Sequence, residues 1–254
     1  MAAGKGKIVT GPPDFVGVGA QRSGTTWWFR TLLSHPQIRP PRKGRKELHF
    51  FEPYGARPMR DEDVPRYHEL FPRRPDQIAG EWTPRYMADA WTAPLLKRAA
   101  PDAKLLVMLR DPIERYRSGV VHRATRSPDA RAEIVARDAI ERGRYTSQLR
   151  GLLEVFERDR ILVLQYERCR LDPIGQYRRT LEFLGVDDHV PEDVQRLRGT
   201  TMQSGKKPLW PDLQEALRVT LGPEVRALVE MVPDLDLDLW SNFSQLPSDD
   251  GVLA

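Results

Sequence analysis

The chain has 254 residues, of which 40% are hydrophobic and 30% charged, and its formal net charge at pH 7 is +4. Its single cysteine, Cys169, excludes an internal disulfide. No apolar run reaches the roughly 20 residues that span a bilayer, and the N-terminus lacks the apolar stretch of a secretion signal. We therefore expect a soluble, cytoplasmic protein with one domain over residues 1–254, and flexible tails at 1–13 and 244–254.

Strand-like and helix-like segments alternate along the chain. Short apolar runs between turn residues predict buried strands, at 14–20, 103–112 and 160–169, and residues 75–87 give a further short apolar segment with a turn at Thr83-Pro84. Amphipathic or proline-started stretches predict helices, at 23–36, 61–71, 87–100, 112–126, 139–159, 172–186 and 211–232, the last as one helix or two. This alternation predicts a three-layer α/β fold with a central, mostly parallel sheet flanked by helices.

The first chemistry-bearing stretch is GAQRSGTT, residues 19–26, which joins a predicted strand to a predicted helix. Glycines permit a tight turn, and a helix N-terminus offers free N–H groups to an anion. Gly19 and Gly24 have the spacing of the ATP-type phosphate loop, but Thr25 stands where that loop has its lysine. The nearby cation is Arg22. The simpler alternative is a tight turn with no ligand.

The second stretch is RDPIERYRS, residues 110–118, at the end of the strongest predicted strand. Arg110 is expected at the carboxyl edge of the sheet, where open α/β sheets bind ligands. Ser118 follows within two helical turns, so one phosphate could contact both side chains. The alternative is that Arg110 pairs with Asp111 or a helix carboxylate and Ser118 faces water.

The third stretch is RKELHFFEP, where Lys46, Glu47 and His49 precede an aromatic pair. Glu47 or His49 could act as a general base, because each can accept a proton. A solvated charged surface is the alternative. Two weaker signals are the loop SGKKP with Lys206 and Lys207, and Tyr166 at the end of a predicted strand, which could line a nucleotide-base pocket or simply belong to the core.

In this order, the stretches resemble the sulfotransferases that use 3′-phosphoadenosine 5′-phosphosulfate (PAPS), whose fold is similar to that of P-loop NTPases. The resemblance extends from about Phe15 to Trp240, and is strongest to the branch that contains heparan sulfate sulfotransferases and bacterial relatives. GAQRSGTT is similar to the family's 5′-phosphosulfate loop, RDPIERYRS to its 3′-phosphate motif, and KELHFFE to the K-E-x-H-F-F segment. LQYERC and SGKKP resemble its adenine-side segment and cofactor loop.

The resemblance implies transfer of a sulfuryl group from PAPS to a hydroxyl, less readily an amine, of a small-molecule, glycolipid or sugar acceptor, releasing PAP and needing no metal. It implies catalytic roles for Glu47 as base, with His49 as the second choice, and for Arg22. The implied cofactor-binding residues are Gln21, Arg22, Ser23, Gly24, Thr25, Thr26, Trp27, Arg110, Ser118, Tyr166, Gly205, Lys206 and Lys207. Natural product biosynthesis is an expected setting.

Two departures from the family pattern stand out. Arg22 replaces the usual loop lysine, and Trp82 stands where the heparan branch often has a lysine, so acceptor binding there must differ. Candidate acceptor walls are residues 54–79 and 125–137, which are long, polar and irregular. An ATP-dependent kinase and a catalytically inactive nucleotide- or glycan-binding protein remain as alternatives. No nucleic-acid-binding module is recognisable, and a homodimer is left open.

Overall fold

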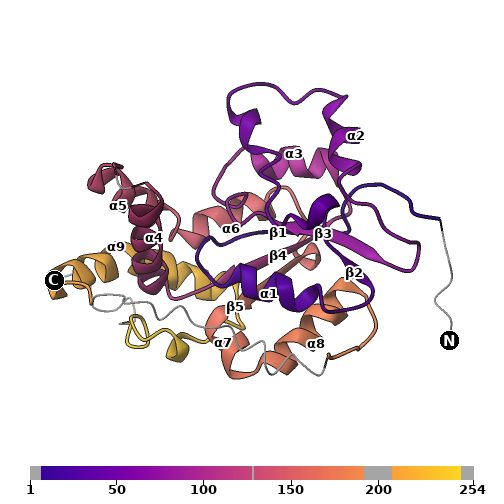
Figure 1. Cartoon of the computed structure of the whole chain (residues 1–254). Coiled ribbons are helices and arrows are strands. Elements are labelled where there is room, and N and C mark those ends of the chain that lie inside the picture. The colour runs from indigo at the N-terminus through magenta and orange to yellow at the C-terminus, as the bar shows by residue number, and fades with distance from the viewer. Residues whose placement is uncertain (1–6, 128, 192–207, 247–254) are drawn as a thin grey trace.

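A computed structural model describes residues 7–127, 129–191 and 208–246 of the chain. Its centre is a five-stranded sheet in the order β2-β3-β1-β4-β5. Every strand pair is parallel. The strands are β1 (Phe15–Gly19), β2 (Ile38–Arg39), β3 (Ile78–Trp82), β4 (Lys104–Leu109) and β5 (Ile161–Gln165). The predicted parallel α/β fold is therefore confirmed (Figure 1).

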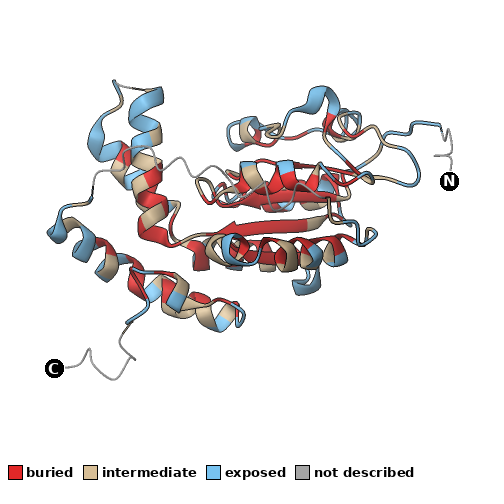
Figure 2. Ribbon diagram, turned by 60° about the horizontal axis from the view of Figure 1, so that its bottom comes forward, coloured by how far each residue is buried: buried red, intermediate tan, exposed pale blue. Residues whose placement is uncertain are grey.

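Helices cover both faces of the sheet because its strands are apolar on both sides. Along β4, Leu106 and Met108 face one core, whereas Leu105, Val107 and Leu109 face the other. The first core is closed by α1 (Thr25–Leu32), α7 (Tyr166–Leu171) and α8 (Pro173–Leu184). The second is closed by α3 (Thr92–Ala99), α6 (Tyr145–Leu153) and α9 (Pro211–Met231). Buried residues accordingly concentrate in the sheet and on the inner helix faces (Figure 2).

The remaining elements lie at the edges of these layers. They are the helices α2 (Asp63–His68), α4 (Pro112–Arg126) and α5 (Ala132–Glu141), and the 3₁₀ turns η1 (Arg42–Gly44), η2 (Glu52–Gly55), η3 (Arg158–Arg160) and η5 (Leu237–Leu239). Helix α4 has the predicted bounds. Asp111 caps it by accepting from the backbone N–H groups of Ile113 and Glu114, at 2.9 and 3.2 Å.

Several elements differ from the sequence prediction. The helix expected over 139–159 corresponds to the end of α5 and to α6, which are separated because Gly143 closes a turn on Ile140 O at 2.7 Å. Helix α5 begins at Ala132, so the stretch 125–137, predicted to be irregular, is partly helical. The strand expected over 160–169 ends at Gln165, where the chain turns into α7. Strand β2 was not expected at all. One helix, α9, spans the region predicted to hold one or two, and continues through Pro223.

The order of the strands determines where a ligand can bind. All strands run in one direction, so their carboxyl ends meet at one edge of the sheet. The loops after β1, β4 and β5 begin at that edge, where open α/β sheets hold their ligands. Arg22, Arg110 and Tyr166, three of the candidate site residues, follow these three strands.

Candidate active site

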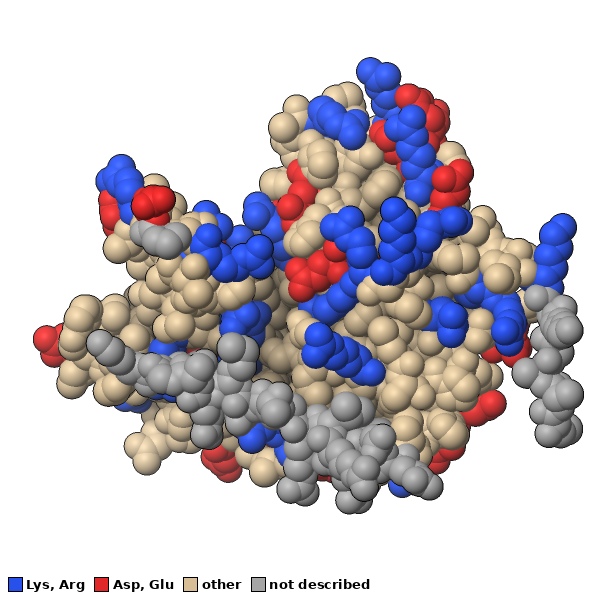
Figure 3. Space-filling model, in the orientation of Figure 1, with Lys and Arg blue, Asp and Glu red and all other residues tan. Residues whose placement is uncertain are grey.

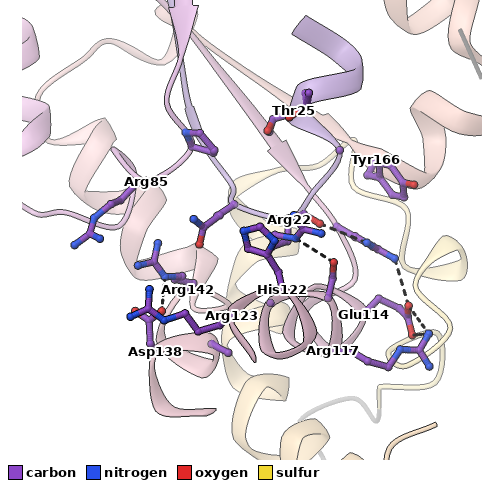
Figure 4. A pocket seen from close by; sticks show the side chains of 18 of the residues that line it. Arg22, Thr25, Arg85, Glu114, Arg117, His122, Arg123, Asp138, Arg142 and Tyr166 are labelled. Carbon is purple, nitrogen blue, oxygen red and sulfur yellow. Dashed lines mark hydrogen bonds and ion pairs between the residues drawn. The ribbon is translucent and has the colours of Figure 1, made fainter. Parts of the chain in front are cut away.

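A cavity of about 1220 Å³ opens at the carboxyl edge of the sheet. It brings together most of the predicted site residues, although they come from separate parts of the chain (Figure 4). Those that line it are Gln21, Arg22, Gly24, Thr25, Thr26, Trp27, Glu47, His49, Arg110, Ser118 and Tyr166. The cavity is therefore the candidate active site.

The loop after β1 has the geometry of an anion-binding turn. Gly24 has φ 86°, a left-handed conformation that favours glycine, and α1 begins at the next residue. A Cβ at Gly24 would lie 2.5 Å from Cδ2 of Tyr166, so a side chain is excluded there on steric grounds as well. The loop is supported from below by Trp82, whose indole Nε1 donates to Gly19 O at 3.0 Å. The N-terminus of α1 thus faces the cavity with its N–H groups available to an anion.

Arg22, Arg110 and Ser118 meet on one side of the cavity. Arg22 Nε donates to Ser118 Oγ at 3.2 Å, and Arg110 Nη1 donates to Arg22 O at 3.4 Å. Burial, and secondarily the charge of Arg110, lowers the pKa of Arg22 from its usual value. The Arg110 guanidinium lies 5.0 Å from the centre of the Tyr166 ring. Two cations so close together, beside an aromatic ring, favour an anionic aromatic ligand such as a nucleotide.

Glu114 balances part of this charge. Its carboxylate is 3.3 Å from Arg110 Nη2 and 2.7 Å from Arg117 Nη2. The carboxylate next to Arg110 is therefore the helix residue Glu114. Asp111, the other partner considered, is buried and caps α4.

Glu47 and His49 also line the cavity, and Lys46 precedes them on the segment between η1 and η2. Glu47 Oε1 is 2.8 Å from Lys46 Nζ, and Glu47 Oε2 is 3.4 Å from His49 Nε2. The second ring nitrogen of His49, Nδ1, is 2.5 Å from Glu52 Oε1. The Glu47 side chain is 34% exposed, so its carboxylate can reach a ligand in the cavity.

Lys46 is the functional residue that the sequence analysis undervalued. Its side chain is only 14% exposed, and Nζ donates to Thr25 Oγ1 of the phosphate-binding loop at 3.0 Å. Burial lowers the pKa of Lys46, whereas the neighbouring Glu47 raises it. The sequence shows Lys46 beside Glu47, but it gives no sign that the ammonium reaches Thr25. Lys46 thus supplies an ammonium at the loop, in which Arg22 stands in place of the usual lysine.

Further basic side chains, from α4, the end of α5 and the turn after β3, also line the cavity: Arg85, Arg117, His122, Arg123, Arg126 and Arg142. In Figure 4, Arg85, Arg123 and Arg142 lie at the opposite end of the view from Tyr166. Burial first, and then the charges of Arg22 and Arg126, lowers the pKa of His122. On the face shown in Figure 3, Lys and Arg side chains gather across the middle of the molecule. Ser118, His122 and Arg126 recur every four residues and therefore share one face of α4. This spacing is the sequence signal that could have added His122 and Arg126 to the predicted site.

Some predicted site residues are not part of this cavity. Ser23 is fully buried and does not line it. Gly205, Lys206 and Lys207 lie outside the described residues. Of the two expected acceptor walls, 125–137 contributes Arg126, Ser127 and Val135, whereas 54–79 contributes no lining residue. None of the helices within the described ranges is long and apolar enough to cross a membrane.

Comparison with known proteins places this site in a family. Residues 12–218 match the sulfotransferase domain. The chain is 36% identical over 104 residues to the membrane-associated sulfotransferase kil1 of Dictyostelium discoideum, which covers 41% of this chain and 21% of that protein. It is 28% identical over 188 residues to heparan sulfate glucosamine 3-O-sulfotransferase 3A1 of Mus musculus, covering 68% and 46%. The chain thus spans less than half the length of both relatives.

A solved structure gives the same assignment over the whole fold. The sulfotransferase from Alicyclobacillus acidocaldarius is 29% identical and superimposes with a TM-score of 0.71, over 90% of this chain and 98% of that one. The match to the sulfotransferase domain includes the phosphate-binding loop, Glu47, Arg110 and Ser118. With its parallel sheet and its cavity at the sheet edge, the chain belongs to the sulfotransferase domain family.

Proposed function

We propose that this chain transfers a sulfuryl group from PAPS to a hydroxyl group of an acceptor and releases PAP. The observation that carries the proposal is the contact of Lys46 with both Thr25 and Glu47. This contact joins an anion-binding loop to a carboxylate that can accept a proton. Family membership supports the same reaction.

The donor would bind along the sheet edge. The backbone of residues 21–26 and the hydroxyls of Thr25 and Thr26 would hold the 5′-phosphosulfate at the N-terminus of α1. Arg110 and Ser118 would hold the 3′-phosphate, and the ring of Tyr166 would lie beside the adenine. The 3.2 Å contact between Arg22 and Ser118 supports one continuous donor site, because it places both phosphate-binding groups within reach of one nucleotide.

The transfer needs a base on the acceptor side. Glu47 accepts the proton of the acceptor hydroxyl as the acceptor oxygen forms its bond to sulfur. The bond between sulfur and the bridging oxygen breaks, and its electron pair leaves with the phosphate of PAP. His49 contacts the same carboxylate and can hold it in place, since its Nε2 is 3.4 Å from Glu47 Oε2.

Cations stabilise the charge that develops during this step. Arg22 belongs to the loop after β1 and Lys46 contacts it at Thr25, and burial removes part of the hydration of both cations. Preorganised charges in such surroundings stabilise a transition state more strongly than they would in water. Arg22 donates hydrogen bonds but cannot exchange a proton near neutral pH, so any proton donated to the leaving oxygen would come from Lys46.

The acceptor is proposed to carry an anionic group besides its hydroxyl. Arg85, Arg123, Arg126 and Arg142 line the cavity, and two of them are paired: Arg85 with Asp89 at 2.8 Å and Arg142 with Asp138 at 2.9 Å. The remaining guanidinium groups suit a sulfate, phosphate or carboxylate on a sugar, lipid or small molecule. A cytoplasmic location and a homodimer stay predictions.

A transfer assay tests the proposal. The full chain is incubated with PAPS and a panel of alcohols in matched neutral and anionic forms, and sulfated products are detected by mass spectrometry. We expect sulfation of an anionic alcohol, and a loss of turnover of about 10²–10⁴-fold in Glu47→Gln, because the amide cannot accept the proton.

The affinity for PAP provides the control, since Glu47→Gln should bind PAP as tightly as the wild type. Normal turnover in Glu47→Gln, with turnover abolished in His49→Ala, would move the base to His49. Tight PAP binding without sulfation of any acceptor in the panel would favour the inactive binding protein.

A further inference from the structure

The catalytic side chains are carried by a segment that has no helix or strand of its own. This base segment, residues 46–50, is fastened to the chain that follows β3 through its backbone. Lys46 O accepts from the backbone N–H of Trp82 at 2.9 Å. At the other end, Phe50 N donates to the Tyr86 hydroxyl at 2.8 Å. Both ends of the base segment are therefore held by residues 82–86.

The middle of the base segment is held by two side chains. Leu48 N donates to Thr83 Oγ1 at 3.0 Å and to Glu81 Oε2 at 3.2 Å. His49 N donates to Thr83 Oγ1 at 3.4 Å. His49 has φ 53°, a left-handed conformation that a non-glycine residue rarely adopts without support from its surroundings. The contacts to Thr83 and Glu81 are that support.

Glu81 lies at the centre of these contacts and is fully buried. Its Oε2 accepts from Thr83 Oγ1 at 2.5 Å, and its Oε1 accepts from the hydroxyls of Tyr67 and Tyr86 at 2.8 and 3.3 Å. Since Thr83 and Tyr86 give their protons to Glu81, their oxygen lone pairs are left to accept from the base segment. The carboxylate thus orients the two hydroxyls that hold the backbone of residues 48–50.

We propose that Glu81 is a positioning residue for the base segment, and that its negative charge keeps Glu47 and His49 aimed into the cavity. The inference rests on the proposed sulfuryl transfer. Every partner of Glu81 donates a hydrogen bond to it, and a backbone N–H cannot reverse that role. A glutamine amide has an NH₂ group in place of one carboxylate oxygen. That NH₂ group would face other hydrogen-bond donors, either the hydroxyls of Tyr67 and Tyr86 or Thr83 Oγ1 and Leu48 N.

This arrangement predicts a pH dependence. Burial raises the pKa of Glu81 to about 7, although the hydrogen bonds from Thr83 and Tyr67 oppose the shift. The titratable groups that face it are Tyr67 of α2, Tyr86 after β3, and Lys46 on the base segment. Protonation would put a donor on Glu81, so the rate of transfer should fall as the pH is lowered through this value.

The test compares Glu81→Gln with the wild-type full chain, measuring kcat, KM for PAPS and PAP affinity. We expect kcat at pH 8 to fall by about 10–100-fold, the effect of a small misplacement of a catalytic group. KM for PAPS, PAP affinity and Tm should remain near the wild-type values. The fall in kcat near pH 7 should be absent from the variant.

Thr83 and Tyr67 provide matched variants. Thr83→Val, which removes the hydroxyl at constant shape, should lower kcat as Glu81→Gln does, whereas Thr83→Ser should restore it. Tyr67→Phe removes a hydroxyl that donates to Glu81 and keeps the ring that packs against Phe50 at 4.7 Å between ring centres, so kcat at pH 8 should be retained. If Glu81→Gln does not fold, the Thr83→Val and Thr83→Ser pair decides alone, and equal kcat in the two would overturn the proposal.

The failure of this inference can be told apart from failure of the proposed function. If the wild-type chain neither binds PAP nor sulfates any alcohol, the proposed sulfuryl transfer itself is refuted. An active wild type with an equally active Glu81→Gln would overturn only the positioning role. A variant that loses PAP binding and Tm together with kcat would show a general structural role instead.

Discussion

At the scale of single residues, Lys46 changes the interpretation of the phosphate-binding loop. The sequence has arginine and tryptophan at two positions where related enzymes often have lysine, Arg22 and Trp82. In the fold, Trp82 Nε1 donates to Gly19 O at the start of the loop, and Lys46 Nζ donates to Thr25 Oγ1 at its end. Two different side chains thus provide the support and the charge.

Lys46→Met should lower kcat by about 10–10³-fold while the chain stays folded, because methionine keeps most of the apolar stem of the side chain and loses the charge and its hydrogen bonds. Turnover with PAPS measures this effect. Lys43→Met, at an exposed position on the same connection, is the matched control and should leave kcat unchanged. Equal kcat in both variants would remove Lys46 from the transfer step.

Arg110→Ala should weaken PAP binding by about 1.5–3 kcal/mol, the size of a lost hydrogen bond to a charged group. The guanidinium contacts Arg22 O and Glu114 and faces Tyr166, so it is already held in position before a ligand binds. Isothermal titration with PAP checks the change, and Arg60→Ala, at an exposed arginine, serves as control. Unchanged PAP affinity in Arg110→Ala would contradict the 3′-phosphate assignment.

At the scale of elements, the β4–α4 junction is tied to the C-terminal part of the chain through two carboxylates, the buried Asp111 and the half-buried Glu167. Asp111 Oδ2 accepts from Asn242 Nδ2 at 2.8 Å. Glu167, at the start of α7, accepts from Asp111 N at 3.1 Å and from Trp240 Nε1 at 2.9 Å. These contacts hold the strand end that carries Arg110.

This junction should make stability depend on pH. Burial raises the pKa of Glu167 from 4.5 to about 7, so between these values the folded chain binds more protons than the unfolded chain. The free energy of unfolding due to Glu167 therefore falls as pH rises through this window. The free energy of unfolding of Glu167→Gln, taken relative to that of the wild type, should rise by up to about 3 kcal/mol between pH 5 and pH 8. Urea denaturation of both proteins measures the gain, and a pH-independent difference between them would refute it.

The sequence predicted elements well where the signal was local. The run of apolar residues in β4 and the proline that starts α4 were sufficient for both. The division between α5 and α6 was not predictable from periodicity, because it depends on packing. Helix α5 lies against α4, whereas α6 lies against α9. The first residue of α6, Tyr145, also donates through its hydroxyl to Arg110 O at 2.9 Å. Strand β2 has only two residues, Ile38–Arg39, which is too short for a pattern.

At the scale of the whole molecule, the parallel sheet gathers residues from loops far apart in sequence into one cavity. The sequence could place Arg22, Arg110 and Tyr166 at one edge, because each lies at or just after the carboxyl end of a predicted strand. It could not place Lys46 against Thr25, nor Arg142 in the cavity, because those contacts depend on how loops and α5 fold back over the edge. Which of the loop and α5 residues line the cavity therefore depends on tertiary contacts rather than on spacing along the chain.

The central claim is that this cavity binds a 3′-phosphorylated adenosine nucleotide rather than ATP. Two features support it: Arg110 and Ser118 beside the loop, and the absence of an ATP-type lysine at Thr25. The most direct measurement is isothermal titration of the full chain with PAP and, separately, with ATP and Mg²⁺. We predict saturable binding of PAP and much weaker binding of ATP; tight binding of ATP with Mg²⁺ and none of PAP would contradict the account.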